Sequence, residues 1–279
     1  MTAPDRPADA PGMRLRQLRW LLPPFSVVFI AVSVFGCGWW GWPPLPFAAI
    51  ALLLVAVSTD GIARPSSSLF YPTLSHGPRG TKRVALSFDD GPDPAVTPQV
   101  LDVLARHGAR ATFFVIGSAL EAQPELARRM VREGHVIGNH SWQHSPWQNF
   151  CGAAWHAREL ARGEEAVAGF TGQERVLYRP PIGLKSPELG RAVWTRGLTL
   201  VAWSLHSKDT RDRDPASIAR RVLARAQGGD IVLLHDGHHL PGGHREHCAE
   251  ALRIILEGLE ARGLECVTVP ELLGLSGGA

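Results

Sequence analysis

The chain has 279 residues, of which 45% are hydrophobic and 20% are charged, and its 29 Lys and Arg exceed its 26 Asp and Glu by three. This balance is that of an ordinary globular protein, which excludes a disordered chain, a collagen-like repeat and a membrane protein of many spans. A net charge of +3 supplies no basic field for a phosphate backbone, so we expect no nucleic-acid partner.

The N-terminal 59 residues depart from this average. Residues 1–19 form a basic tail with four Arg and two Asp, and residues 20–59 contain no Asp, Glu, Lys or Arg. An uncharged apolar run of about 20 residues is enough to cross a bilayer as a helix. Pro43 and Pro44 disfavour one continuous helix, so the run predicts a membrane segment of two helices, one on each side of the prolines.

Two spans near 20–40 and 45–59 would return the remaining chain to the side on which the N-terminus lies. Four Arg ahead of the first span keep that terminus in the cytoplasm by the positive-inside rule, so two helices favour a cytoplasmic domain. The three cysteines beyond the segment form no Cys-x-x-Cys pair, in agreement with a reducing compartment. A single span would place the domain outside, and a signal peptide followed by a buried core helix is the other interpretation left open.

Residues 60–80 are rich in Pro and Ser and are expected to be a linker. Beyond them, short apolar runs alternate with amphipathic stretches about six times. The expected strands are 83–88, 111–116, 136–138, 198–203, 231–234 and 266–269. The expected helices are 98–107, 124–133, 153–168, 187–196, 215–226 and 249–262.

This alternation indicates an α/β fold with a parallel sheet, either doubly wound or closed as a barrel. We expect one domain over residues 81–273. Residues 80–279 carry 23 basic and 23 acidic side chains, so the excess positive charge lies in the segments that flank the apolar run.

Polar residues at the carboxyl ends of parallel strands are where such a sheet keeps its site. Asp89 and Asp90 follow the first strand in a Gly-Pro turn, which alone could be a solvated turn. His140 and His144 follow the third strand, and histidines four apart on one face of a helical turn can share a metal. With a carboxylate from another strand they would form an Asp/His/His site with an open position for water, which is typical of hydrolytic metals. A pair of surface histidines is the alternative.

Other strand ends carry matching features. His235 follows an apolar strand, His206 and Asp209 follow another, and Arg179 precedes two prolines. A buried Arg in such a place normally holds a carboxylate. The remaining histidines gather in a Gly/Pro-rich loop with irregular spacing, from which we expect no functional metal site: His238, His239, His244 and His247.

In this order, the segments resemble the polysaccharide deacetylase family, which is the NodB-homology domain or carbohydrate esterase family 4. Residues 87–92 resemble its motif Thr-Phe-Asp-Asp-Gly-Pro with Ser in place of Thr, and 140–144 match His-Ser-x-x-His. Residues 179–181 match Arg-x-Pro, and 233–235 match Leu-x-His. The resemblance covers residues 81–273. It implies a distorted (β/α) barrel of about seven strands. Because the transmembrane helical hairpin predicted from the apolar run precedes this domain, we expect the protein in the cell membrane of a bacterium.

The resemblance also implies a divalent metal, usually zinc, held by Asp90, His140 and His144. Asp89 would be the general base toward the attacking water. The Ile182 N–H would donate to the oxyanion, and His235 would be the general acid. Arg179 would orient the base Asp89, and Asp209 would orient the acid His235. The expected substrate walls are Pro180, Pro181, Trp203, Leu233 and Thr210.

Two departures from the family pattern concern the substrate. The motif Asp-x-x-Asp-Trp reads His206-Ser207-Lys208-Asp209-Thr210 here, and Ile182 replaces the aromatic residue after Arg-x-Pro. The catalytic residues are then retained, while the aromatic surfaces on which a sugar could stack are lost at both positions. We therefore expect a substrate other than plain chitin or peptidoglycan.

The implied function is a membrane-anchored metal-dependent hydrolase that removes an N-acetyl or other N-acyl group from an amino sugar of a polysaccharide, an oligosaccharide or a lipid-linked glycan. A deformylase or other amide hydrolase acting on a lipid-carried sugar would use the same catalytic residues. An inactive carbohydrate-binding membrane protein is the alternative of a different class. The sequence indicates no protein partner.

Overall fold

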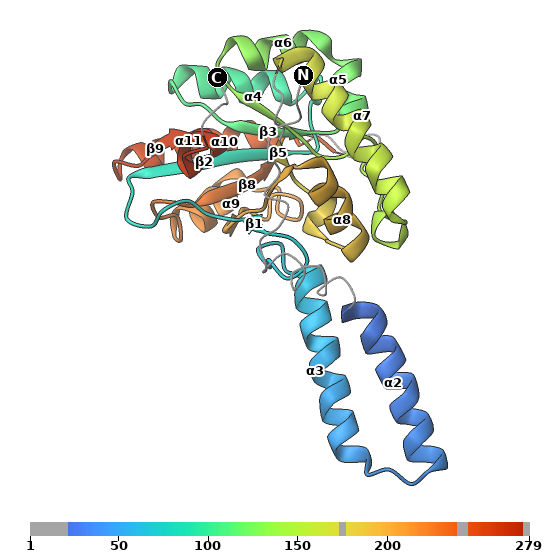
Figure 1. Cartoon of the computed structure of the whole chain (residues 1–279). Coiled ribbons are helices and arrows are strands. Elements are labelled where there is room, and N and C mark those ends of the chain that lie inside the picture. The colour runs from blue at the N-terminus through green and yellow to red at the C-terminus, as the bar shows by residue number, and fades with distance from the viewer. Residues whose placement is uncertain (1–21, 173–176, 239–244, 276–279) are drawn as a thin grey trace.

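The structure is a computed structural model that describes residues 22–172, 177–238 and 245–275. The basic tail expected at 1–19 lies outside the described residues. Figure 1 shows a helical hairpin that projects from an α/β domain.

The hairpin consists of α2 (Leu22–Trp39) and α3 (Pro44–Ala63), which run antiparallel (Figure 1). The Oγ atoms of Ser26 and Ser58 lie 3.2 Å apart between the helices, and most other side chains of the pair are exposed. Among the described helices, only α3 is long and apolar enough to cross a membrane, and the apolar part of α2 is shorter. The two helices are therefore present as expected, while their insertion in a membrane stays a prediction.

The segment expected as a linker, 60–80, is held firmly to the domain. Helix α3 continues into it as far as Ala63, and the two-residue strand β1 (Thr73–Leu74) lies inside it. The buried Lys185 donates from Nζ to the carbonyls of Pro65 (2.7 Å) and Ser67 (2.5 Å). The C-terminal end of α3 is thus fixed beside the sheet.

A single parallel sheet of nine strands organises the domain, in the order β1-β6-β5-β4-β3-β2-β8-β7, with β9 paired to the start of β2. The strands after β1 are β2 (Arg83–Asp89), β3 (Thr112–Val115), β4 (Val136–Asn139), β5 (Leu177–Tyr178), β6 (Thr199–Val201), β7 (Leu205–His206), β8 (Ile231–His235) and β9 (Glu265–Val267). The sheet therefore has nine strands where a distorted barrel of about seven was expected. The end strands β1 and β7 do not pair, so the sheet is a curled half-barrel.

Helices cover the outside of this sheet (Figure 1). They are α4 (Thr97–Arg106), α5 (Gly117–Ala122), α6 (Pro124–Arg132), α7 (Ala153–Thr171), α8 (Pro187–Arg196), α9 (Pro215–Leu223), α10 (His247–Glu260) and α11 (Val269–Leu273), with 3-10 turns η2 (Gln148–Phe150) and η3 (Pro181–Gly183). All six expected helices are present. Local chemistry explains two of their starts: the side chains of Ser186 and Asp214 cap α8 and α9, and a proline follows each cap.

Strand β2 shows how the fold separates packing from chemistry. Side chains alternate between the two faces of a strand, and Val84, Leu86 and Phe88 join the core that includes the helices. Ser87 and Asp89 therefore point to the concave side. The same alternation turns Phe114 of β3 inward, into a smaller core inside the curl.

Candidate active site

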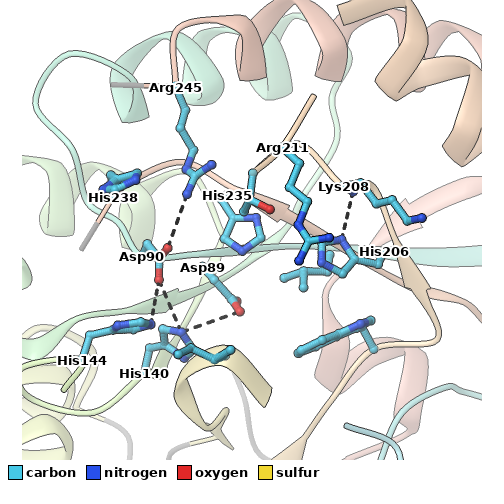
Figure 2. A pocket seen from close by; sticks show the side chains of 14 residues that line it. Asp89, Asp90, His140, His144, His206, Lys208, Arg211, His235, His238 and Arg245 are labelled. Carbon is cyan, nitrogen blue, oxygen red and sulfur yellow. Dashed lines mark hydrogen bonds and ion pairs between the residues drawn. The ribbon is translucent and has the colours of Figure 1, made fainter. Parts of the chain in front are cut away.

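Four strands deliver polar side chains to one edge of the sheet. Asp89 ends β2, His235 ends β8, and His140 and Arg179 directly follow β4 and β5. Because these strands run parallel in one sheet, their carboxyl ends lie at the same edge. A cavity of about 550 Å³ opens there, as Figure 2 shows.

Asp90, His140 and His144 bring three possible metal ligands together. One donor atom from each lies within 4.8 Å of the others, and all three residues are buried. The Oδ1 atom of Asp90 is 3.5 Å from Nε2 of His140 and 3.2 Å from Nε2 of His144. The Nδ1 atom of His140 lies 2.8 Å from the Arg179 carbonyl, so Nδ1 carries the proton and Nε2 keeps its lone pair. This donor set fits a divalent ion of the zinc type.

The two histidines converge through a turn that is not helical, which corrects the expected helical spacing. Ser141 and His144 adopt φ values of 69° and 51°. The Asn139 side chain accepts from the Ser141 N–H at 2.8 Å, and the Ser141 hydroxyl accepts from the His144 N–H at 3.0 Å. These bonds fold the segment back more tightly than a helix, and Gly163 of α7 leaves the room that Asn139 needs.

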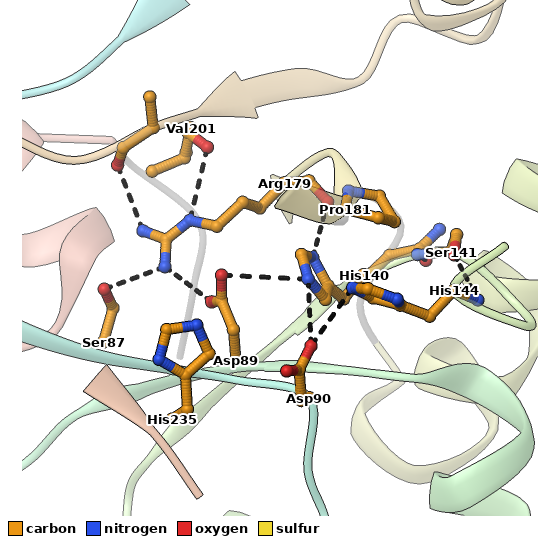
Figure 3. Close-up of polar contacts among 12 residues, drawn as sticks. Ser87, Asp89, Asp90, His140, Ser141, His144, Arg179, Pro181, Val201 and His235 are labelled. Atoms are coloured by element: carbon orange, nitrogen blue, oxygen red, sulfur yellow. Dashed lines mark hydrogen bonds and ion pairs between the residues drawn. The ribbon is translucent and has the colours of Figure 1, made fainter. Parts of the chain in front are cut away.

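Asp89 is held by a fully buried guanidinium (Figure 3). Arg179 donates from Nη1 to Oδ1 of Asp89 at 2.7 Å and to the Ser87 hydroxyl at 2.9 Å. Its other nitrogens donate to the carbonyls of Val201 and Ala202. The second oxygen of Asp89, Oδ2, lies 3.8 Å from Nε2 of His140, so it faces the ligand cluster.

Asp209 contacts both the imidazole ring and the backbone N–H of His235. Its Oδ1 atom is 2.9 Å from Nδ1 of the imidazole, and its Oδ2 atom accepts from the His235 N–H at 2.7 Å. Burial alone would lower the pKa of His235, but the charge and hydrogen bond of Asp209 outweigh it and raise that pKa to about 9. The imidazole is therefore protonated at neutral pH, with Nε2 left for a substrate.

Backbone strain is concentrated around the cavity. Every described residue other than glycine with a positive φ lies at this edge of the sheet: Asp90, Ser141, His144, Ile182 and Lys208. Each such conformation costs about 1–3 kcal/mol and persists only where its surroundings enforce it. The strain therefore marks the same place as the polar cluster.

The structure divides the expected substrate-contacting residues into two groups. Ile182, Trp203, Thr210 and Leu233 line the cavity. Pro180 and Pro181 are buried and are absent from the lining. The Pro181 carbonyl instead accepts from Nε2 of Gln148 at 3.0 Å, which supports the turn that carries Ile182.

Sequence reasoning assigned no role to several residues that line the cavity: His206, Lys208, Arg211, His238 and Arg245. Arg245 is buried, donates from Nε to the Gly237 carbonyl at 2.7 Å, and places Nη2 3.9 Å from Asp90. No local pattern signals it, since it reaches the site from a loop far along the chain.

The histidine-rich loop offers no described metal cluster of its own. His238 lines the main cavity, and Nε2 of His247 lies 3.1 Å from the Asp209 carbonyl. His239 and His244 lie outside the described residues.

A curled parallel half-barrel carries, at its carboxyl edge, an Asp/His/His cluster, a carboxylate held by a buried guanidinium and an imidazole paired with a second carboxylate, an arrangement that fits a hydrolase. The family model for polysaccharide deacetylase matches residues 76–201. The chain belongs to the polysaccharide deacetylase family, as its motifs predict.

Two named relatives and one crystal structure show which proteins the chain is similar to. The chain is 38% identical over 203 residues to the chitooligosaccharide deacetylase of Bradyrhizobium sp., covering 69% of this chain and 91% of that protein. It is 38% identical over 193 residues to the peptidoglycan-N-acetylglucosamine deacetylase PgdA of Listeria monocytogenes, covering 69% of this chain but only 39% of PgdA. The crystal structure of the Bc1960 peptidoglycan N-acetylglucosamine deacetylase superposes with a TM-score of 0.68 at 31% identity, over 74% of this chain and 95% of that one.

Proposed function

We propose that the chain is a metal-dependent deacetylase that hydrolyses the N-acetyl group of an amino sugar in a glycan. One observation carries this proposal: the Asp90/His140/His144 cluster and the base Asp89 share a cavity with the imidazole of His235. A carboxylate base and an imidazole acid at one site suit an amide, whose nitrogen must gain a proton before it leaves.

Asp90, His140 and His144 would hold the ion, for which we propose zinc. A bound divalent ion of this type polarises a carbonyl and lowers the pKa of water toward about 7. The Arg179 carbonyl fixes the ring of His140 through a bond of 2.8 Å, which orients this ligand before the ion binds.

Asp89 would accept the proton of the attacking water at Oδ2. Arg179 occupies Oδ1, so one carboxylate oxygen is fixed and the other is directed to the reacting atoms. As the carbonyl carbon becomes tetrahedral, the Ile182 N–H at the cavity wall would donate to the developing oxyanion. His235 would then protonate the amine nitrogen from Nε2 as the C–N bond breaks.

The substrate would lie between Trp203, Leu233, Ile182 and Thr210, which line the cavity. Ile182 has 56% of its surface exposed and offers an aliphatic contact in place of a ring. Thr210 likewise presents a small polar side chain, which supports a substrate that differs from plain chitin or peptidoglycan.

We also propose that the α2–α3 hairpin anchors the enzyme in the bacterial cell membrane, with the domain on the cytoplasmic side. The uncharged composition of residues 20–59 and the exposure of the apolar side chains of both helices support this placement, because exposed apolar surface of this extent requires a partner.

Acetate release tests the proposed chemistry. The full chain, purified in detergent, is treated with a chelator and restored with zinc, and then incubated with chitooligosaccharides, peptidoglycan fragments and membrane glycolipid extracts. We expect acetate only from the restored protein. Formate in place of acetate would identify the deformylase alternative, and binding without any acyl release would identify the inactive carbohydrate-binding protein.

A further inference from the structure

A second cavity adjoins the catalytic one and leads to the end of the hairpin that joins the domain. It measures about 460 Å³ and shares Trp203, His206 and Lys208 with the catalytic cavity. Its lining includes Pro65 and Ser66, which follow Arg64, the C-cap of α3. A continuous depression therefore runs from the reacting centre to the point where the hairpin joins the domain.

Cations line this depression. Lys208 and Arg211 belong to the catalytic cavity, Lys208 also borders the second one, and Arg79 and Arg225 line the second one. We call these four residues the basic trough. Figure 2 shows Lys208 and Arg211 beside His206, on the side of the cavity away from His140 and His144.

Among the described residues, Arg79 is the one cation of the basic trough that is paired with a carboxylate. Apart from Asp89 and Asp90, the only acidic residue among the described lining residues is Asp230. It is saturated by Arg79 at 2.6 Å, by the Ser204 hydroxyl at 2.7 Å and by the Gln227 N–H at 2.9 Å. No described acidic residue forms an ion pair with Lys208, Arg211 or Arg225.

This accumulation is local. Residues 80–279 carry equal numbers of basic and acidic side chains, so the basic trough does not reflect a generally basic surface. Some surface cations of this domain are paired instead, as Arg196 with Glu164 and Arg221 with Asp212 are. The charged groups of Lys208, Arg211 and Arg225, which line these cavities without a described carboxylate partner, offer the N–H donors that phosphate oxygens accept.

We propose that the substrate is an acylated amino sugar that carries a phosphate group, and that the basic trough binds this phosphate while the acyl group faces Asp90 and His140. The inference rests on the proposed function and names its substrate class. The phosphate lies on the hairpin side of the sugar, because the trough runs in that direction. Both a lipid-carried sugar phosphate and a soluble glycosyl phosphate present this chemistry.

The test compares two probes that differ only in charge: chitotriose and chitotriose with a phosphate on its reducing end. With the full-length, zinc-restored protein, we expect kcat/KM to be on the order of tenfold higher for the phosphorylated probe, mainly through KM, as one or two charge-assisted contacts supply. Added salt should reduce the difference, because exposed charges are screened. Equal kcat/KM for the two probes would overturn the proposal.

Variants locate the effect. In the double variant Lys208→Gln/Arg211→Gln, the ratio of the two kcat/KM values should fall close to one. Arg213→Gln is the matched control, since it removes the same charge from the same loop but lies outside both cavities, and it should keep the ratio. Arg225→Gln, an exposed position, provides a second test if the double variant does not fold. A ratio that survives both Lys208→Gln/Arg211→Gln and Arg225→Gln would contradict the proposal.

Binding separates this inference from the proposed function. Calorimetric affinities of both probes for the Asp89→Asn variant do not require turnover, so a preference for phosphate would support the trough even if no acetate were released. A polyprenyl-diphosphate-linked N-acetylglucosamine in phosphatidylcholine vesicles forms the last arm. A kcat/KM above that of the soluble phosphorylated probe identifies a lipid-carried substrate, and a lower value identifies a soluble one.

Discussion

Asp89 and Asp90 are adjacent carboxylates to which the fold gives different partners. Arg179 contacts Asp89, whereas His140 and His144 contact Asp90. The positive φ of Asp90, 72°, turns the second carboxylate away from the direction of the first. Two identical side chains can therefore serve as base and as ligand.

Replacing Asp89 by Asn tests this division. We expect turnover to fall by about 10²–10⁴-fold, the usual contribution of a general base, while bound zinc stays at the wild-type level. Acetate release and metal analysis of the same preparation measure both. Asp90→Asn should instead lose the metal together with the activity, and near-normal turnover in Asp89→Asn would refute the base assignment.

The pH dependence of kcat/KM on the alkaline side is set by the His235–Asp209 pair. Because the pKa of His235 is raised to about 9, its acid form is complete at neutral pH and is lost as pH rises through that value. Asp209→Asn removes the charge that raises the pKa, so the alkaline limb of kcat/KM should move to lower pH. Measuring kcat/KM of both proteins between pH 5 and 10 gives the shift of the alkaline limb. An unchanged limb would show that His235 is not the acid.

At the scale of elements, the 3-10 turn Pro181–Gly183 combines strain with a proposed catalytic N–H. Ile182 has a φ of 60°, which costs a residue with a Cβ about 1–2 kcal/mol, while glycine would bring an entropy cost of about 1 kcal/mol. Because the Ile182 side chain is largely exposed, these terms nearly cancel. Ile182→Gly should then keep thermal stability and most of the turnover.

Ile182→Pro is the contrasting variant. Proline removes the N–H and fixes φ near −65°, so turnover should fall by at least about 100-fold, the usual effect of losing one oxyanion donor. Acetate release and thermal unfolding of both variants test the role of the backbone. If Ile182→Gly lost turnover as severely as Ile182→Pro while remaining folded, the side chain would be the important group.

The elements that could be predicted are those with enough residues to show a period. Strands β2 and β8 have seven and five residues, most of them apolar, and both were expected. Strands β1, β5 and β7 have two residues each, too few for any alternation, and they account for the difference between the six strands expected from the apolar runs and the nine observed. Val269 was expected in a strand, but the capping box of Thr268 and Glu271 begins α11 there.

The residues of the candidate site could likewise be predicted only where they adjoin a recognisable element. Asp90, His140 and His235 lie next to predictable strand ends, so their convergence could be expected. Lys208 and Arg211 stand in a loop without a periodic signal, and their grouping with Arg79 and Arg225 depends on a cavity that only the folded chain forms. The turn after His140 could not be predicted either, because side-chain bonds from Asn139 and Ser141 override the helical spacing.

At the scale of the molecule, the hairpin and the domain are joined closely. Gly61 of α3 lies against Leu69 and Phe70, and Lys185 bonds to the carbonyls just after the helix. Burial lowers the pKa of Lys185 to about 8, in keeping with its enclosed position. The hairpin therefore sets the orientation of the cavity relative to any membrane it enters.

Reporter fusions test the proposed topology. A green fluorescent protein or an alkaline phosphatase joined after Arg64 reports the side on which the chain continues beyond α3. Two spans predict fluorescence without phosphatase activity. Phosphatase activity would rule out the two-span hairpin and place the domain outside.

The central claim is that Asp90, His140 and His144 hold the ion that amide hydrolysis requires, and metal stoichiometry measured together with turnover tests it most directly. The wild-type chain should bind one equivalent of zinc, and His140→Ala and His144→Ala should each lose both zinc and acetate release. His107→Ala, which removes a histidine paired with Glu260 away from the cavity, should keep both. An equimolar zinc content with undiminished turnover in His140→Ala would contradict the account.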